Sequence, residues 1–150
     1  MRGIIFIFMS AFLLSACCGT DKHQEAENLL QQAQSLYEQG QYTEAKDCII
    51  SIRKNHPNAI DARKKALELS WDIELKEAQN ELAITDSLLQ LVQHDYDRQQ
   101  AKVEKDKANL QATPEELTKL TKTRMKRDSL RTQCEVLGAK IRVIHKKQKE

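Results

Sequence analysis

The chain has 150 residues, of which 31% are charged and only 5% are aromatic, and its formal net charge is +2. This composition is typical of a small helical protein with a thin core, and it argues against a large enzyme and against nucleic acid as a partner. Four Gly, two Pro and the lack of any long alternation of polar and apolar residues predict an all-α fold.

The first sixteen residues have the three-part pattern of a secretion signal. Arg2 gives a short positive start, an apolar run covers 4–14, and the small residues Ser15 and Ala16 follow. The apolar run is too short to cross a membrane as a stable helix, which needs about 20 residues. Residues 1–16 are therefore expected to be a signal peptide that is not part of the fold.

A cysteine directly follows this signal. The segment Leu14-Ser15-Ala16-Cys17 resembles the lipobox of bacterial lipoproteins. The resemblance implies cleavage before Cys17 and lipidation of its sulfur and its new amino group with fatty acids such as palmitate. The alternative is an ordinary signal peptide that happens to end near a cysteine.

Lipidation would determine where the mature protein resides. Each buried CH₂ group of an acyl chain contributes about 0.8 kcal/mol, so two or three chains hold a protein on a bilayer. Residues 17–24 are then a lipidated tether to the membrane. Because Cys18 rather than Asp follows the lipidated residue, the resemblance to bacterial lipoproteins implies an outer-membrane location in a bacterial cell envelope.

Two short helices are predicted after the tether. Apolar residues recur at helical spacing up to Gly40, which is typical of a C-terminal cap, and again up to Pro57, which ends the second helix. The segment 26–59 resembles one tetratricopeptide repeat, with Ala33 at the contact between the helices and Tyr42 near the turn.

This segment departs from the repeat pattern at Gln32, where the family usually has an apolar residue, and at Ile52 and Arg53, which replace the usual Ala and Leu. A single repeat cannot bury its own face, because such units gain their core from their neighbours. The beginning of the next helix is therefore expected to complete a three-helix, tetratricopeptide-like head over 25–71.

The strongest pattern in the chain is a coiled-coil seam in its middle. One row recurs every seven residues: Leu75, Leu82, Leu89, Tyr96, Val103 and Leu110. A companion row completes the alternating spacing of three and four: Trp71, Ala78, Thr85, Val92, Gln99 and Asp106. Because no Gly or Pro interrupts the chain between 58 and 111, one long helix that needs a partner is expected.

The partner is predicted to be the next helix in the chain. The segment 113–116 has the signature of a capping box with Pro114 at the first helical position, and the helix should run to about Lys147. Its apolar face consists of Leu120, Leu130, Cys134, Leu137, Ile141 and Ile144. The short connection predicts a long antiparallel two-helix coiled-coil hairpin over 72–150.

The same pattern predicts a register for this hairpin. With a pivot at 112–113, facing residues should have numbers that add up to about 226, which places Leu89 against Leu137. Toward the tip Gln99 would then face Arg127, so apolar burial should fade outward. Residues from about 99 to 128 are therefore expected to open more often than the stem.

The returning helix is basic. Residues 114–150 contain 11 Lys or Arg and 5 acidic residues, so they should attract the more acidic remainder of the mature chain. Six basic residues around the tip form a candidate surface for an acidic protein partner: Lys119, Lys122, Arg124, Lys126, Arg127 and Arg131. The alternatives are a soluble end without a binding role, and binding of an anionic polymer or of lipid head groups.

No motif in the sequence predicts catalysis. The four His are isolated, no CxxC is present, and His94 with Asp97 could supply at most half of a metal site. A phosphate-binding loop, a nucleophile elbow and a carboxylate pair suited to acid–base chemistry are also missing. No enzyme activity, cofactor, metal or small-molecule substrate is therefore expected.

Together these patterns predict a lipid-anchored cell-envelope protein that acts as a protein-interaction or scaffolding module. The alternative is a periplasmic chaperone-like holding factor that grips client chains with its helical hairpin. Apolar residues exposed on the inner face of the hairpin, together with oligomerisation, would favour the holding factor. A monomeric rod with a closed seam would favour the scaffold.

Overall fold

The computed structural model describes residues 22–150, which form four α-helices and no strand. The helices are α1 (Lys22–Glu38), α2 (Tyr42–Asn55), α3 (Ile60–Ala108) and α4 (Pro114–Lys147). The predicted all-α class and the predicted long helix are confirmed. The predicted signal peptide (1–16) and the lipidation residue Cys17 lie outside the described residues.

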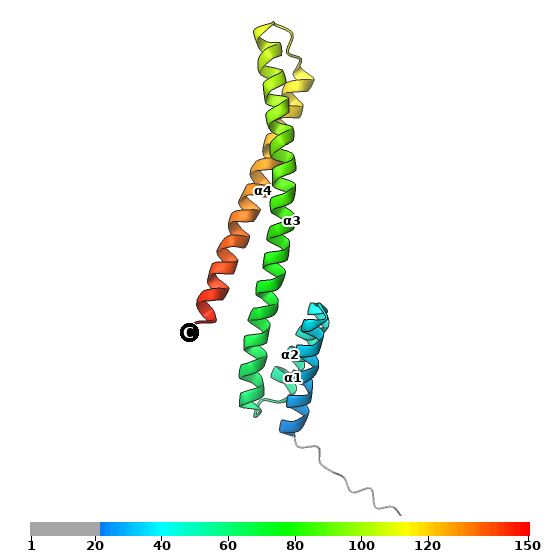
Figure 1. Ribbon diagram of the computed structural model, residues 1–150, viewed down its shortest axis with the longest axis vertical. Coiled ribbons are helices and arrows are strands. Elements are labelled where there is room, and N and C mark those ends of the chain that lie inside the picture. Colours follow the sequence, from blue (N-terminus) through cyan, green and yellow to red (C-terminus); the bar gives the residue numbers. More distant parts are fainter. Residues whose placement is uncertain (1–21) are drawn as a thin grey trace, which may run out of the picture.

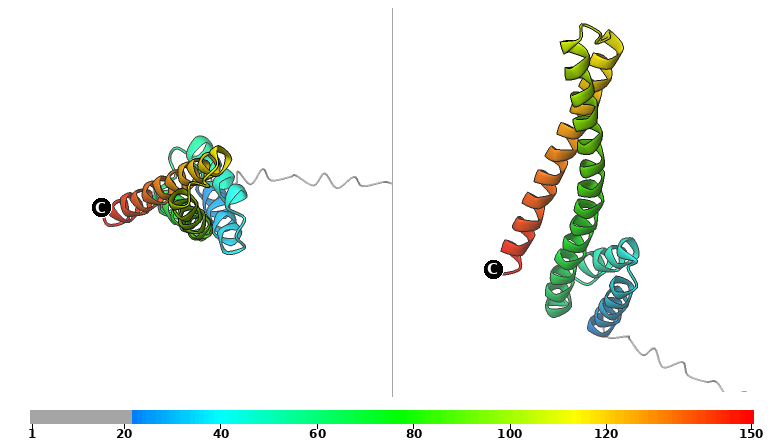
Figure 2. Two further views of the ribbon diagram at one scale, coloured as in Figure 1. Left: turned by 90° about the horizontal axis from the view of Figure 1, so that it is seen from above. Right: turned by 45° about the horizontal axis from the view of Figure 1, so that its top comes forward.

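Helix α3 is the axis on which the other helices are arranged. Helices α1 and α2 pack on each other and on the first part of α3, whereas α4 returns antiparallel along the remainder (Figure 1). Both views in Figure 2 place the α1–α2 pair and the end of α4 on different sides of α3. Within 22–150, α4 contacts neither α1 nor α2, so α3 alone connects the head to the hairpin.

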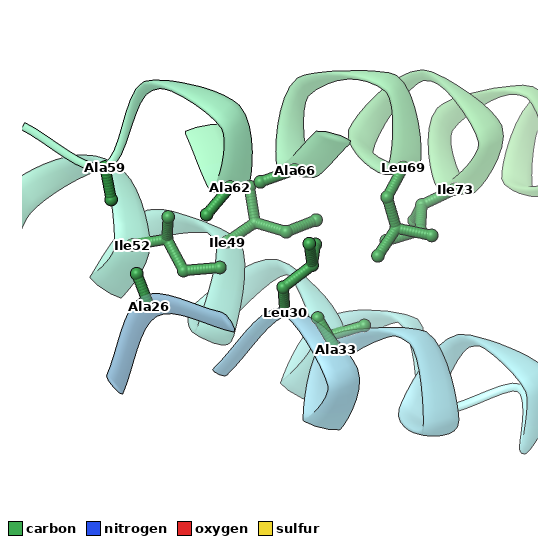
Figure 3. Packing of buried hydrophobic residues seen from close by; sticks show 11 residues of the cluster. Ala26, Leu30, Ala33, Ile49, Ile52, Ala59, Ala62, Ala66, Leu69 and Ile73 are labelled. Carbon is green, nitrogen blue, oxygen red and sulfur yellow. The ribbon is translucent and has the colours of Figure 1, made fainter. Parts of the chain in front are cut away.

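The head has a continuous apolar core made by α1, α2 and the beginning of α3 (Figure 3). Its buried residues are Ala26, Leu30, Ala33, Ala45, Ile49, Ile52, Ala59, Ala62, Ala66, Leu69 and Ile73. Many of them are alanines, and small side chains at helix contacts let the helix axes approach closely. Ala33 is completely buried, as its predicted place between the helices requires. The core continues to Ile73, two residues beyond the predicted end of the head.

The turn between α1 and α2 is a Schellman motif around Gly40. Gly40 has φ +77°, a left-handed conformation that glycine adopts without a steric penalty. Its N–H donates to the carbonyl of Tyr37 (3.0 Å), and the N–H of Gln41 donates to the carbonyl of Leu36 (2.9 Å). The predicted cap is therefore confirmed, and the turn also brings the rings of Tyr37 and Tyr42 to a centroid distance of 5.8 Å.

The seam between α3 and α4 uses the predicted rows. On α3 the seam positions, all of them buried or half-buried, are Leu75, Ala78, Leu82, Thr85, Leu89, Val92, Tyr96, Gln99, Val103 and Asp106. On α4 they are Glu116, Leu120, Thr123, Arg127, Leu130, Cys134, Leu137, Ile141 and Ile144. Both sets keep the alternating spacing of three and four that holds a seam against its partner. The predicted member Leu110 does not belong to the seam, because α3 ends before it and its side chain is 96% exposed.

Helix α4 begins at the predicted capping box. The backbone N–H of Glu116 donates to Thr113 Oγ1 (3.2 Å), and the N–H of Thr113 donates back to Glu116 Oε2 (3.1 Å). Pro114 occupies the first turn of α4, where its missing N–H costs no hydrogen bond. The start of α4 was therefore predicted to the residue.

The predicted register of the hairpin is wrong by about six residues. Thr123 bonds to Gln99 and Arg127 contacts Tyr96, and the cross-helix contacts join residues whose numbers add up to about 220 rather than about 226. The turn is centred on residue 111, because α3 ends at Ala108 and α4 begins at Pro114.

Candidate functional site

The six predicted basic residues do not form one patch. Five of them are exposed on the first half of α4, whereas Arg127 lies in the seam. Lys119 and Lys126 are one heptad apart on one flank of the seam, with Lys122 further out on the same side. Arg124 and Arg131 are one heptad apart on the other flank. The tip therefore offers two separate basic edges.

Arg127 has partners within the hairpin. Its guanidinium lies 4.2 Å from the centre of the Tyr96 ring, and its Nη2 is 2.7 Å from Asp128 Oδ1. The hydrogen bonds to Asp128 are the main reason that the pKa of Arg127 is raised. Because only 15% of this side chain is exposed, its charge is used mainly to hold α4 against α3.

Charged side chains connect the two helices at the tip turn, and the turn itself contains the exposed residue Leu110. Lys102 Nζ contacts the carboxylates of Asp106 and Glu116, which raises the pKa of Lys102 and, through the same hydrogen bond, lowers the pKa of Glu116. Leu110 adopts φ +57°, and the N–H of Gln111 donates to the Asp106 carbonyl (2.7 Å). The turn thus repeats the Schellman geometry with leucine where glycine is usual.

A groove that the sequence did not indicate lies where the seam of α3 continues past the end of α4. Its volume is about 420 Å³, and Trp71 and Leu67 of α3 line it together with the last residues of the chain. Gln148 Nε2 donates to Asp72 Oδ1 (2.8 Å) at its edge. Trp71 is only half-buried, so it borders this groove instead of filling the head core.

Buried polar groups in the head do not assemble into a reactive site. His56 is 5% exposed, its Nε2 lies 3.9 Å from the Glu25 carboxylate, and its Nδ1 has no hydrogen-bond partner within the described residues. Cys48 and Cys134 are free thiols, and burial raises the pKa of Cys48, which disfavours its reactive thiolate. Between residues 22 and 150, no three His, Cys, Asp or Glu side chains gather in a way that could hold a metal ion.

The relation of the protein to membranes was predicted from residues that the structure does not describe. Cys17 and the start of the predicted tether (17–24) precede the described part of the chain. Helix α1 already begins at Lys22, three residues before the predicted start of the ordered head. None of the helices between 22 and 150 is long and apolar enough to cross a membrane.

Comparison of the chain with protein-family models, with curated proteins and with solved structures gave no match.

Proposed function

We propose that the protein is a lipid-anchored component of the bacterial cell envelope, in the outer membrane, that acts as a scaffold for other proteins. The lipobox-like segment ending at Cys17 supports the anchor. Helix α1 begins at Lys22, so very few residues would separate the acylated cysteine from the head. In this proposal, the head stays close to the membrane surface.

The length and direction of α3 are the observations that carry the scaffold function. Helix α3 has 49 residues, which gives a length of about 74 Å at about 1.5 Å per residue. The head lies at the beginning of α3 and the hairpin turn at its far end (Figure 1). An anchor at the head would therefore present the tip, with its two basic edges, far from the lipid.

The closed seam supports a scaffold over a holding factor for unfolded chains. Leu130, Leu137 and Ile144 of α4 are buried against α3, so the inner face of the hairpin is already occupied within one molecule. The holding factor stays the second candidate because Ile84 and Leu91 are exposed on the outside of α3. If the protein is a holding factor, it should suppress the aggregation of an unfolded model client at equimolar concentration. A scaffold should not suppress it.

Acylation can be tested with the full chain expressed in a bacterium that is fed an alkyne-labelled fatty acid. The wild type and the Cys18→Ala control should carry the label and sediment with membranes. Cys17→Ala should lose the label and leave the membrane fraction or stay uncleaved. Retention of the label by Cys17→Ala would overturn the proposed anchor.

The partner can be sought by crosslinking in envelope membranes, followed by capture of the protein. Two charge-reversal variants compare the basic edges: Lys119→Glu with Lys126→Glu on one flank, and Arg124→Glu with Arg131→Glu on the other. Each variant changes the charge by the same amount on the same helix, so each is the matched control of the other. Loss of captured proteins in one variant would identify the binding edge. An unchanged set of partners in both, with the fold intact, would remove the tip from the proposal.

A further inference from the structure

Five of the large apolar side chains that are exposed on the hairpin form two short strips. Ile84, Leu88 and Leu91 lie on α3, spaced by four and three residues, and Val136 and Val143 lie one heptad apart on α4. Their exposed fractions range from 39% for Leu88 to 71% for Ile84. The spacing on each helix keeps the residues on one stripe, so each helix has an apolar strip beside the seam.

The two strips lie on the same side of the hairpin. A groove near the tip is lined by both Lys102 of α3 and Lys119 of α4, so these two residues mark the same side of the seam. Leu88 is two heptads before Lys102 and therefore shares its flank. On α4, a second groove is lined by Lys119 and Lys122, and Val136 follows Lys122 by two heptads. We call the surface formed by Ile84, Leu88, Leu91, Val136 and Val143 the hairpin face.

Charged residues of opposite sign lie next to the seam, between the two apolar strips of the hairpin face. The row on α3 contains Glu74, Glu81 and Asp95, which share the heptad position of Leu88. The row on α4 contains Lys126, Lys140 and Lys147, which share the heptad position of Lys119. In the part of the chain that the structure describes, all of these except Asp95, which pairs with Arg98, lack an ion-pair partner. The face thus has an apolar strip on each outer side, with an acidic row on α3 and a basic row on α4 between the two strips.

We propose that the hairpin face binds a second copy of this chain in a parallel arrangement, with a two-fold axis along the rods. In this arrangement α3 of each copy lies beside α4 of the other copy at the same height. Glu74, Glu81 and Asp95 of one copy then face three lysines of the other: Lys147, Lys140 and Lys126, respectively. The residue numbers of each pair add up to about 221, close to the register of the contacts within the hairpin.

The charge pattern selects the parallel arrangement. In an antiparallel dimer centred on the apolar strip, α4 would face α4, and Lys126 would lie opposite Lys140 of the other copy. Like charges in such positions are destabilising, whereas opposite charges fix the orientation of helices. The parallel arrangement also places both heads at the same end, as two lipid anchors in one membrane require. It departs from the monomeric rod that the sequence predicts for a scaffold.

The orientation can be tested by disulfide crosslinking of two differently tagged full-length chains, one with Ile84→Cys and one with Val136→Cys. Because each chain carries only one new cysteine, a peptide that joins positions 84 and 136 must come from two copies. The matched control pairs Ala83→Cys with Glu135→Cys on the opposite flank. The proposal predicts several-fold more crosslinking for 84 with 136 than for 83 with 135. A predominant link between Ile84→Cys and Leu91→Cys chains would indicate an antiparallel dimer and overturn the proposal.

A second measurement tests the face without new cysteines. Sedimentation equilibrium of the full chain in detergent should give the mass of a dimer for the wild type and for Ala83→Glu. Leu88→Glu places the same charge inside the proposed interface and should weaken self-association roughly tenfold or more, with an unchanged circular dichroism spectrum. A wild-type monomer at micromolar concentration, or equal dimerisation of both variants, would overturn the proposal. Neither measurement depends on acylation, so a negative result would refute the dimer without affecting the proposed lipid anchor.

Discussion

The guanidinium of Arg127 stacks on the ring of Tyr96 across the seam, 4.2 Å from the ring centre. This contact marks the boundary between two parts of the hairpin. Toward the head the seam is closed by Leu130, Leu137 and Ile144. Toward the tip polar contacts such as that between Thr123 and Gln99 (3.1 Å) are interleaved with apolar ones.

Removing this stacking contact should weaken the hairpin measurably. Cation–π contacts contribute about 0.5–1 kcal/mol at partly exposed sites, and the hydrogen bonds to Asp128 add to this. Arg127→Ala should therefore lower the free energy of unfolding in urea by about 1 kcal/mol. Arg131→Ala, which removes an exposed arginine from the same helix, should change it by less than about 0.5 kcal/mol. Equal effects of the two variants would contradict the assigned contact.

The left-handed leucine in the tip turn should be open to improvement. This conformation costs a non-glycine residue about 1–2 kcal/mol. Glycine has no such steric penalty, and its main cost is the larger conformational entropy that it loses on folding. Leu110→Gly should consequently raise the thermal midpoint by a few degrees, because the 96% exposed side chain loses little burial. The control Asn109→Gly, at φ −91°, should not stabilise. A lower midpoint for Leu110→Gly would contradict the turn geometry.

The ion pair at the start of α4 should make the tip sensitive to acid. The hydrogen bond that Lys102 donates to the Glu116 carboxylate lowers the pKa of Glu116 below the usual 4.5. A carboxyl group whose pKa is lower in the folded state than in the unfolded state stabilises the fold. This stabilisation is complete at pH values above 4.5, and it is lost as the pH falls through the folded-state pKa. Glu116→Gln retains an N3 side chain that can complete the capping box but removes the ion pair. Tip amide resonances followed from pH 6 to pH 3 should show acid-induced opening that the variant reduces.

Amide hydrogen exchange should divide the hairpin at the Tyr96–Arg127 contact. The stem buries Leu130, Leu137 and Ile144, and each such side chain contributes roughly 1.5–3 kcal/mol of burial. Exposed ion pairs near the tip contribute about 0.2–1 kcal/mol. Amides in 99–128 should therefore exchange faster than those around Leu89 and Leu137. Equal or stronger protection at the tip would contradict this division.

The helices and the seam were predictable because their signals are local and repeated. The capping box at Thr113 and the glycine cap at Gly40 act within a few residues, and the heptad rows identify the seam positions on both helices. The register was not predictable in the same way. It depends on where α3 ends, and Leu110 takes the cap position without the glycine that would have marked it.

The candidate binding surfaces also include parts that the sequence predicts and parts that it does not. The heptad pattern places Arg127 in the seam, seven residues after Leu120 and seven before Cys134, and the predicted register sets it against Gln99, although it is also a member of the predicted basic surface. Ile84 and Leu91 of the hairpin face are also one heptad apart, but the more complete seam rows dominate the heptad pattern, so the sequence alone does not indicate this face. The groove beside Trp71 depends on where α4 stops relative to α3, which no local motif specifies.

Trp71 gives the protein a built-in optical probe. It is the single tryptophan of the chain, and it stands at the open end of the seam beside the last residues of α4. Detachment of the end of α4 would change the solvent around its indole ring while leaving the buried head core on the other side of α3 in place. The emission wavelength of this one residue therefore reports the docking of α4 separately from the folding of the head, without any added label.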